Sequence, residues 1–351
     1  MKSRNTIAAS ILVLASLGLT ACNPPMPPEV AALLAEQSYT CVEGDAKVSS
    51  PALLSDVVQG WSDSLTYSCV DPLQTMTMSV ASISDNADIQ ISEAKATCEA
   101  KVSVPLAVEA SVLIFSNSEL SSLYVSEKSL AGILEGSIQN WSDLQSDNPG
   151  SVISKKPLKL VTKTNPEALN SVNEFLTAKK LVGNGTLKLL PDKTVNIDSY
   201  SSMEDGSMAI VPNSYAVSLG LYPASIYLGL DSEGNPILGN PDVNGIQAGA
   251  SQWDFKPSKF GFDVSLNYSK EPSVPEGFDT APTPYQIVYP VNLYLCKDTL
   301  LNRAVSRFVL RLDSQGALGL SYYAQIPEVV RVSALLSVSE GLPTPTPTPT
   351  E

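Results

Sequence analysis

The chain of 351 residues contains no histidine, and this absence excludes several kinds of chemistry. Without imidazole, the side chain that most often serves as a general base near neutral pH is missing. The sequence also has no Gly-x-Ser-x-Gly segment, and its five cysteines are spaced too widely for a zinc knuckle. Neighbouring carboxylates such as Glu204 and Asp205 are typical of a solvated turn. We therefore expect a protein that is not an enzyme and has neither metal nor cofactor.

Basic residues are scarce as well, since 22 Lys and Arg stand against 36 Asp and Glu and give a net charge of −14. Nucleic-acid phosphates repel such a chain, so nucleic acid is excluded as a partner. Beyond the first 21 residues, no run of about 18 uninterrupted apolar residues predicts a membrane-spanning helix. The hydrophobic content of 43% nevertheless suffices for two domain-sized cores.

The first 22 residues resemble the leader of a bacterial lipoprotein. Lys2 and Arg4 form a basic start, an apolar stretch covers 7–19, and the letters LTAC end at Cys22. The resemblance implies cleavage before Cys22 and lipidation of that cysteine. We expect 1–21 to be a signal peptide, and the mature chain to be lipid-anchored on the outer face of the bacterial cell membrane. An ordinary signal peptide before an incidental cysteine is the alternative.

Proline-rich stretches flank the part of the chain that should fold. The letters NPPMPP predict an extended spacer, which we assign to 22–37. The letters LPTPTPTPTE predict an extended and solvated tail, assigned to 338–351. The intervening part has no internal repeat and should form the core.

Four cysteines remain in an exported chain once Cys22 is lipidated, namely Cys41, Cys69, Cys98 and Cys296. An even number of cysteines in an exported protein predicts disulfides, here two. Three pairings are possible, and the sequence does not choose among them.

Strand-like and helix-like stretches alternate, which favours an α/β sheet with crossover helices. The expected strands are 39–42, 66–70, 87–91, 110–115, 158–162, 208–211 and 293–296. A loop is expected over 44–50. A helix should follow over 51–64, with Ser50 as its N-cap and Pro51 at its first position.

A second helix is expected to end at Gly136. Leu130, Ile133 and Leu134 recur at helical spacing and form one apolar face. A glycine directly after them is a common helix stop, and Trp141 then supplies a large apolar anchor.

Six segments, in order along the chain, resemble the phosphate-binding proteins that serve high-affinity phosphate ABC importers. They are ADIQISEAKA (87–96), LAGILEGSIQNWSDL (130–144), DGSMAIVPNSYA (205–216), DSEGNPILGNPDVNGIQAGASQW (231–253), YPVNLYLCKD (289–298) and VSRFVLRLDSQGALGLSYYAQIP (305–327). No single segment is specific, but together they span almost the whole part expected to fold.

The resemblance implies an α/β protein with the two-lobed periplasmic-binding-protein fold of type 2. Each lobe would be a mixed sheet flanked by helices, with the ligand in the cleft between the lobes. Lobe one would comprise 38–116 plus 286–337, and lobe two 117–285. The implied partners are a small anion such as phosphate and an ABC permease, and the implied state is a monomer.

The resemblance also identifies candidate ligand-binding residues at the edge of lobe one. Ser49 and Ser50 stand where the family has a Gly-, Ser- and Thr-rich loop before a helix. Glu93, preceded by Ser92, stands where the family has an aspartate that accepts the proton of phosphate. The alternatives are a plain helix cap for the serines and a solvated side chain for the glutamate.

A further family segment, an arginine followed by Ser-Gly-Thr at the start of a helix, is mostly absent from this sequence. Lys163 and Thr164 stand near the family's phosphate-binding arginine and its Ser-Gly-Thr. Lys does not reproduce the bidentate geometry of Arg. Asn165, Pro166 and Glu167 follow and predict an N-cap, a first-turn proline and a first-turn carboxylate. Glu167 would compete with an anion for the N–H groups of that helix.

Two functions of different classes therefore remain. The first is a lipid-anchored extracytoplasmic solute-binding protein that captures phosphate or another small anion for an ABC importer. The second is a degenerate binding fold that serves as a non-transport surface module for sensing, adhesion or envelope assembly. Affinity for a small anion separates them.

Overall fold

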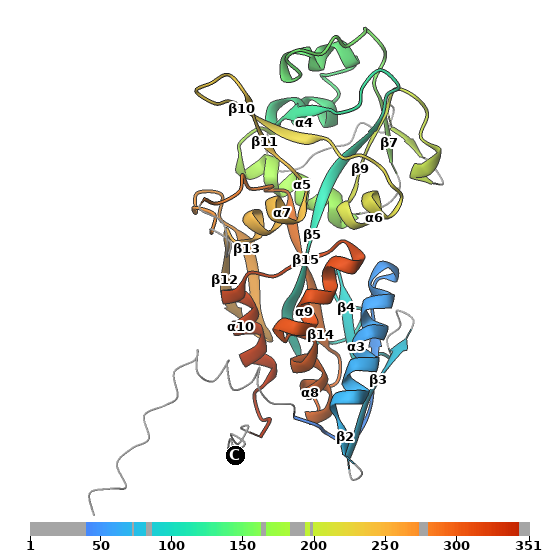
Figure 1. Cartoon of the computed structure of the whole chain (residues 1–351), viewed down its shortest axis with the longest axis vertical. Coiled ribbons are helices and arrows are strands. Elements are labelled where there is room, and N and C mark those ends of the chain that lie inside the picture. The colour runs from blue at the N-terminus through green and yellow to red at the C-terminus, as the bar shows by residue number, and fades with distance from the viewer. Residues whose placement is uncertain are drawn as a thin grey trace, which may run out of the picture.

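The structure is a computed structural model that describes residues 40–71, 74–81, 86–162, 166–182, 194–196, 199–273 and 280–343 (Figure 1). The predicted signal peptide, Cys22 and the spacer up to residue 37 lie outside the described residues. So do Lys163, Thr164 and the Thr-Pro tail from residue 344 on.

Two long antiparallel strands, β5 (Val102–Ser116) and β14 (Val288–Leu295), run through the middle of the molecule and connect its two halves (Figure 1). We call these halves the lower and the upper lobe, as Figure 1 draws them. The main sheet has the order β2-β3-β1-β4-β14-β5-β9-β7-β8, with parallel and antiparallel neighbours. The mixed α/β class predicted from the sequence is confirmed.

The lower lobe contains one end of this sheet and helices that pack beside it (Figure 1). Its strands are β1 (Gly44–Ser49), β2 (Val70–Asp71), β3 (Gln74–Ala81) and β4 (Ile89–Ser92). Its helices are α3 (Ser55–Ser68), α8 (Leu300–Val309), α9 (Leu312–Gly316) and α10 (Glu328–Val338).

The upper lobe contains the other end of the sheet and a small second sheet (Figure 1). Its main-sheet strands are β7 (Lys159–Thr162), β8 (Thr194–Asn196) and β9 (Ser207–Pro212). The second sheet comprises β6 (Tyr124–Ser126), β10 (Ser225–Leu230) and β11 (Pro236–Gly239). Its helices are α4 (Glu127–Glu135), α5 (Pro166–Ala178) and α6 (Asn213–Ser218).

The remaining elements lie against the two connecting strands. Helix α7 (Val243–Ala250) packs on β5, β14 and β15 (Ala324–Gln325). The hairpin β12 (Trp253–Ser258) and β13 (Gly261–Leu266) meets β5 at Ser103. None of the helices in the described part of the chain is long and apolar enough to cross a membrane.

Strand β5 forms the centre of the core. Its residues are buried almost continuously from Val104 to Ile114, rather than on alternate positions. Strands covered on both faces show this continuous pattern. Glu109 is the one charged residue within β5, and it is as buried as its apolar neighbours.

The start of the chain departs from three sequence-based predictions. The strand expected over 39–42 is wrong, because 40–42 belong to no strand. Residues 44–50 were expected to be a loop, yet Gly44–Ser49 is a parallel strand between β3 and β4. The strand predicted at 66–70 is wrong, because α3 continues to Ser68. In β1, Ala46 and Val48 point into the core, while Asp45 accepts the hydroxyls of Thr77 and Ser79 on β3.

The predicted N-cap at Ser50 is also wrong. A 3₁₀ turn, Ala52–Leu54, precedes α3, and Pro51 is the residue that flanks this turn. The Ser50 hydroxyl has no hydrogen-bond partner among the described residues. The apolar stripe itself is as predicted, since Leu54, Val57, Val58 and Trp61 are buried.

Helix α4 confirms its predicted end. Gly136 adopts a left-handed conformation with φ of 75°, which costs a glycine little. Ser126 caps the start by accepting the N–H of Ser129 at 3.2 Å. Trp141 is fully buried and donates its indole N–H to the Gly206 carbonyl at 3.1 Å.

The four cysteines form two disulfides, as predicted, and the structure supplies the pairing. Cys41 is bonded to Cys69 and Cys98 to Cys296. The first bridge fastens the entry of β1 to the end of α3. The second fastens the segment that follows β4 to the end of β14.

Candidate functional site

Two of the predicted site segments meet at one edge of the lower lobe. Strands β1 and β4 are parallel neighbours, with Ser49 in register with Gln90. Ser50 therefore follows the end of β1, while Ser92 and Glu93 come at the end of β4. The carboxyl ends of strands are where open α/β sheets bind ligands.

The three predicted serines differ in their burial and in the hydrogen bonds of their hydroxyl groups. Ser49 is fully buried, and its hydroxyl has no hydrogen-bond partner among the described residues. Ser50 is half-buried with a hydroxyl that is likewise unpaired within the described part. Ser92 instead accepts the N–H of Ala94 at 3.1 Å and so shapes the turn after β4.

Glu93 is held by two phenols. Tyr323 donates its hydroxyl to one carboxylate oxygen of Glu93 at 2.9 Å, and Tyr289 donates to the other at 3.4 Å. Burial raises the pKa of Glu93, the two tyrosine hydroxyls lower it, and the charge of Glu167 raises it further. The net pKa is raised, which favours the neutral acid.

Glu109 is a second carboxyl in this region that sequence reasoning missed. It lies on β5 directly opposite Tyr289 of β14, and it is buried. Its oxygens accept the N–H of Ala110 at 2.8 Å and the N–H and hydroxyl of Ser214. Burial, followed by the charge of Glu93, raises the pKa of Glu109 to about 8. The sequence feature that could have identified Glu109 is a single glutamate inside an otherwise apolar strand.

These side chains form one group that spans the junction of the lobes. We call Glu93, Glu109, Ser214, Tyr289 and Tyr323 the junction cluster. Ser214 lies in the first turn of α6 in the upper lobe, and Glu109 and Tyr289 lie on the connecting strands. Glu93 and Tyr323 belong to the lower lobe. Movement of one lobe against the other would change the contacts within this cluster.

Helix α5 brings another negative charge to the junction. It begins at Pro166 with Glu167 in its first turn, as the sequence predicts. The charge of Glu167 acts on Glu93 and raises its pKa. Among the described residues, no Lys or Arg forms an ion pair with Glu93, Glu109 or Glu167.

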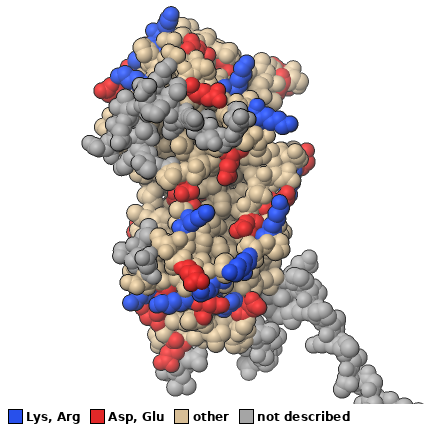
Figure 2. Space-filling view, turned by 180° about the vertical axis from the view of Figure 1, so that it is seen from behind, with Lys and Arg blue, Asp and Glu red and all other residues tan. Residues whose placement is uncertain are grey.

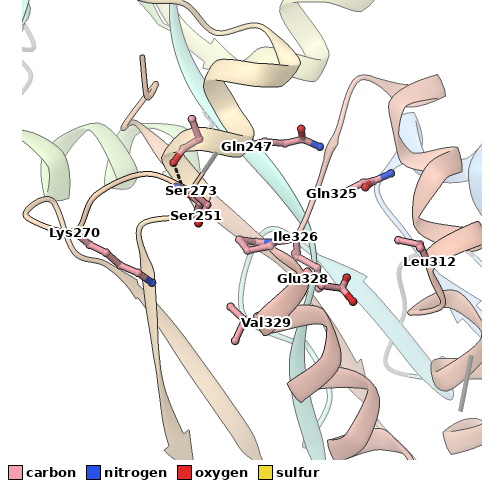
Figure 3. Close-up of a pocket in the computed structure, with 11 residues that line it drawn as sticks. Gln247, Ser251, Lys270, Ser273, Leu312, Gln325, Ile326, Glu328 and Val329 are labelled. Atoms are coloured by element: carbon pink, nitrogen blue, oxygen red, sulfur yellow. Dashed lines mark hydrogen bonds between the residues drawn. The ribbon is translucent and has the colours of Figure 1, made fainter. Parts of the chain in front are cut away.

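A separate cavity of about 550 Å³ lies beside the junction, between α7, the segment around Lys270, and the start of α10 (Figure 3). Gln247 of α7 and Gln325 of β15 both line it, and their amides point in the same direction (Figure 3). Leu312 and Val329 contribute aliphatic groups. The lining contains no member of the junction cluster, so this cavity is a different place from the predicted cleft.

The outer surface carries charges of both signs. Figure 2 shows Lys and Arg side chains beside Asp and Glu over the face opposite to that of Figure 1. Pairs of this kind include Lys297 with Asp88 at 2.6 Å and Arg303 with Asp298 at 2.5 Å. In the described part of the chain, no group of His, Cys, Asp and Glu side chains is arranged to hold a metal ion.

The fold is similar to those of solved phosphate-binding proteins. A high-affinity periplasmic phosphate-binding protein bound with phosphate matches with a TM-score of 0.57 and 14% identity, over 86% of this chain and 96% of that one. The ancestral soluble variant of the human phosphate-binding protein has a TM-score of 0.54 and 14% identity, with coverages of 83% and 93%. The phosphate-binding protein of Stenotrophomonas maltophilia has a TM-score of 0.51 and 12% identity, with coverages of 84% and 93%.

Scans of protein-family models and of curated proteins found no match to the sequence. At identities of 12–14%, the structural matches establish the fold, which is the two-lobed one expected from the sequence segments. The predicted fold is confirmed.

Proposed function

We propose that this chain is a lipid-anchored extracytoplasmic solute-binding protein that captures phosphate or another small anion between its lobes. The anchor is Cys22, and the mature chain begins there. Lobe one consists of 38–116 plus 286–337 and lobe two of 117–285. An ABC permease receives the ligand from a monomeric binding protein.

The observation that carries this proposal is the junction cluster. Glu93 lies at the carboxyl edge of the lower-lobe sheet and is held in place by Tyr289 and Tyr323. Ser50, whose hydroxyl has no hydrogen-bond partner among the described residues, follows the neighbouring strand of the same edge. A ligand that contacts this edge and the start of α5 would contact both lobes, and contacts made only in the closed state drive closure.

The phosphate-binding proteins that share the fold support the choice of an anion as ligand. Phosphate is the ligand that their names state. The start of α5 at Pro166 presents the positive end of a helix dipole, which favours an oxyanion. Glu167 opposes the anion at this same terminus, so we expect the affinity to be modest.

The alternative of a non-transport surface module is favoured by one observation. At the lobe junction the charge of Glu167 acts on Glu93, and the charge of Glu93 acts on Glu109. Like charges repel, and burial away from water strengthens that repulsion. If that repulsion is not relieved by protonation, the cleft rejects anions and the fold serves another purpose.

Calorimetric titration with inorganic phosphate separates the two functions. The protein would be the chain from Asn23 to Glu351, freed of bound ligand by partial unfolding and refolding and titrated at pH 6. Micromolar or tighter binding supports solute capture. Absence of heat and of a thermal shift up to millimolar phosphate would rule out the phosphate role.

A further inference from the structure

Glu109 differs from Glu93 in what it contacts. Its carboxyl group accepts hydrogen bonds from Ala110 and from the backbone and hydroxyl of Ser214, all of which are protein groups. The side chain is 1% exposed. Glu109 therefore has little access to a ligand, but it lies close enough to Glu93 for each charge to affect the other.

The titratable groups around Glu109 come from several elements. Glu93 follows β4, Tyr289 lies on β14 and Tyr323 precedes β15, and each of them interacts electrostatically with Glu109. Helix α6 contributes Ser214, which does not titrate. Glu167 at the start of α5 acts on Glu93. Burial raises the pKa of both tyrosines far above the physiological range, so they stay neutral.

We propose that Glu109 is a specificity-determining residue that sets the charge of the junction cluster and thereby makes anion binding dependent on protonation. As a neutral acid, Glu109 leaves Glu93 as the main carboxyl group facing the ligand. As a carboxylate, it adds a second buried negative charge, and an anion is excluded. This inference rests on the proposed binding of a small anion between the lobes.

The direction in which affinity changes with pH follows from the coupling of anion binding to protonation of Glu109. An anion bound near Glu109 stabilises the protonated form of that residue, so binding takes up a proton wherever free Glu109 is ionised. Affinity is then constant at low pH and declines by up to about tenfold for each pH unit above the pKa. Because that pKa is about 8, the decline begins slightly above neutral pH.

The test compares the parent chain with Glu109→Gln, which keeps the shape of the side chain and removes its charge. Phosphate affinity is measured by calorimetry from pH 6 to pH 9.5. Phosphate itself titrates in this range, but the ratio of the two dissociation constants at each pH cancels that effect. We expect equal affinities at pH 6, and at pH 9 a parent that binds about tenfold more weakly than the variant.

A ratio that stays constant from pH 6 to pH 9.5 would overturn the role of Glu109 while leaving phosphate capture intact. Absence of phosphate binding by both proteins at every pH would overturn the proposed function, and the inference with it. The two failures are therefore distinguishable.

Ser214→Ala provides a second variant if Glu109→Gln does not fold. Its hydroxyl favours the ionised form of Glu109, so its removal should raise the pH at which affinity declines. A purely structural effect would lower affinity equally at all pH values. An unshifted decline in Ser214→Ala would count against the proposal.

Discussion

Tyr323 donates its phenolic hydrogen to Glu93 at 2.9 Å, although 230 residues separate the two along the chain. The residue before it, Tyr322, has a left-handed backbone with φ of 64°, which is uncommon for a residue other than glycine. Such conformations persist where the surrounding structure imposes them, and they are frequent at functional sites. The contact therefore links an unusual turn before β15 to the carboxyl edge of β4.

Replacing Tyr323 with Phe should destabilise the protein by about 1–2 kcal/mol, because a buried hydrogen bond to a carboxyl group is lost. The matched control is Tyr322→Phe. The hydroxyl of Tyr322 has no partner among the described residues, and the residue is 44% exposed. We expect that control to change stability by less than about 0.5 kcal/mol. Urea unfolding of both variants measures the difference, and equal losses would contradict the assigned bond.

Replacing Glu167 with Gln should strengthen phosphate binding by about three- to tenfold at pH 7, since one negative charge leaves the junction. Glu174→Gln is the matched control, because Glu174 lies on the same helix α5 but does not act on Glu93. Calorimetric titration of both variants distinguishes the two positions. An affinity gain of the same size in Glu174→Gln would show only a general charge effect.

Replacing Ser50 with Ala should weaken phosphate binding by about tenfold, since a hydroxyl that bonds a charged group contributes about 1.5 kcal/mol or more. Stability should stay within about 0.5 kcal/mol of the parent, because the Ser50 hydroxyl has no described protein partner. Ser92→Ala is the control, since Ser92 is already engaged with Ala94. Loss of stability without loss of affinity in Ser50→Ala would remove Ser50 from the site.

Periodic apolar patterns and local helix-stop residues correctly predicted helices from the sequence. Leu130, Ile133 and Leu134 with Gly136 predict α4 and its end, because helix spacing and left-handed glycine act locally. The strand β1 was missed because GDAKVS reads as a polar turn until β3 supplies partners for Asp45. Its strand state depends on a neighbour about 30 residues away.

The candidate site was predictable only in part for the same reason. Glu93 could be placed from a resemblance of one segment, but the two tyrosines that hold it lie 196 and 230 residues further along. Glu109 gave a local signal as the one charge in an apolar strand. Its partner Ser214 depends on the crossing of β5 and α6, which no local pattern encodes.

The Cys98–Cys296 bridge should stabilise the fold more than the Cys41–Cys69 bridge, because it closes the longer loop. The sequence separations are 198 and 28 residues. Chain entropy then predicts losses of about 5 and about 3.5 kcal/mol when each pair is replaced by serines. Guanidinium unfolding measures both losses.

Phosphate affinity should fall only in Cys98→Ser/Cys296→Ser, since that bridge fastens the segment carrying Glu93. Equal affinities in the two double variants would show that this bridge does not support the binding site.

Stability should fall as the pH rises from 5 to 8.5, which is the opposite of acid denaturation. Burial raises the pKa of Glu109 to about 8, so between its unfolded value near 4.5 and this value the folded protein binds a proton that the unfolded chain does not. Stability from this group is complete below about pH 4.5 and is lost as the pH rises through 8, with a slope of up to about 1.4 kcal/mol per unit. Ion-paired carboxyls such as Asp88, whose pKa is lowered, act in the opposite direction and only at acidic pH.

Thermal unfolding of the ligand-free chain at half-unit pH steps measures this dependence. A protein of this size should lose roughly 1.5 °C for each kcal/mol. In Glu109→Gln the decline should become much shallower, with the raised pKa of Glu93 supplying what remains. Asp88→Asn is the control, because it should alter the acidic limb and leave the decline above pH 5 unchanged. A parent whose melting temperature is flat from pH 5 to pH 8.5 would mean that water solvates Glu109 and that the junction does not bury a proton.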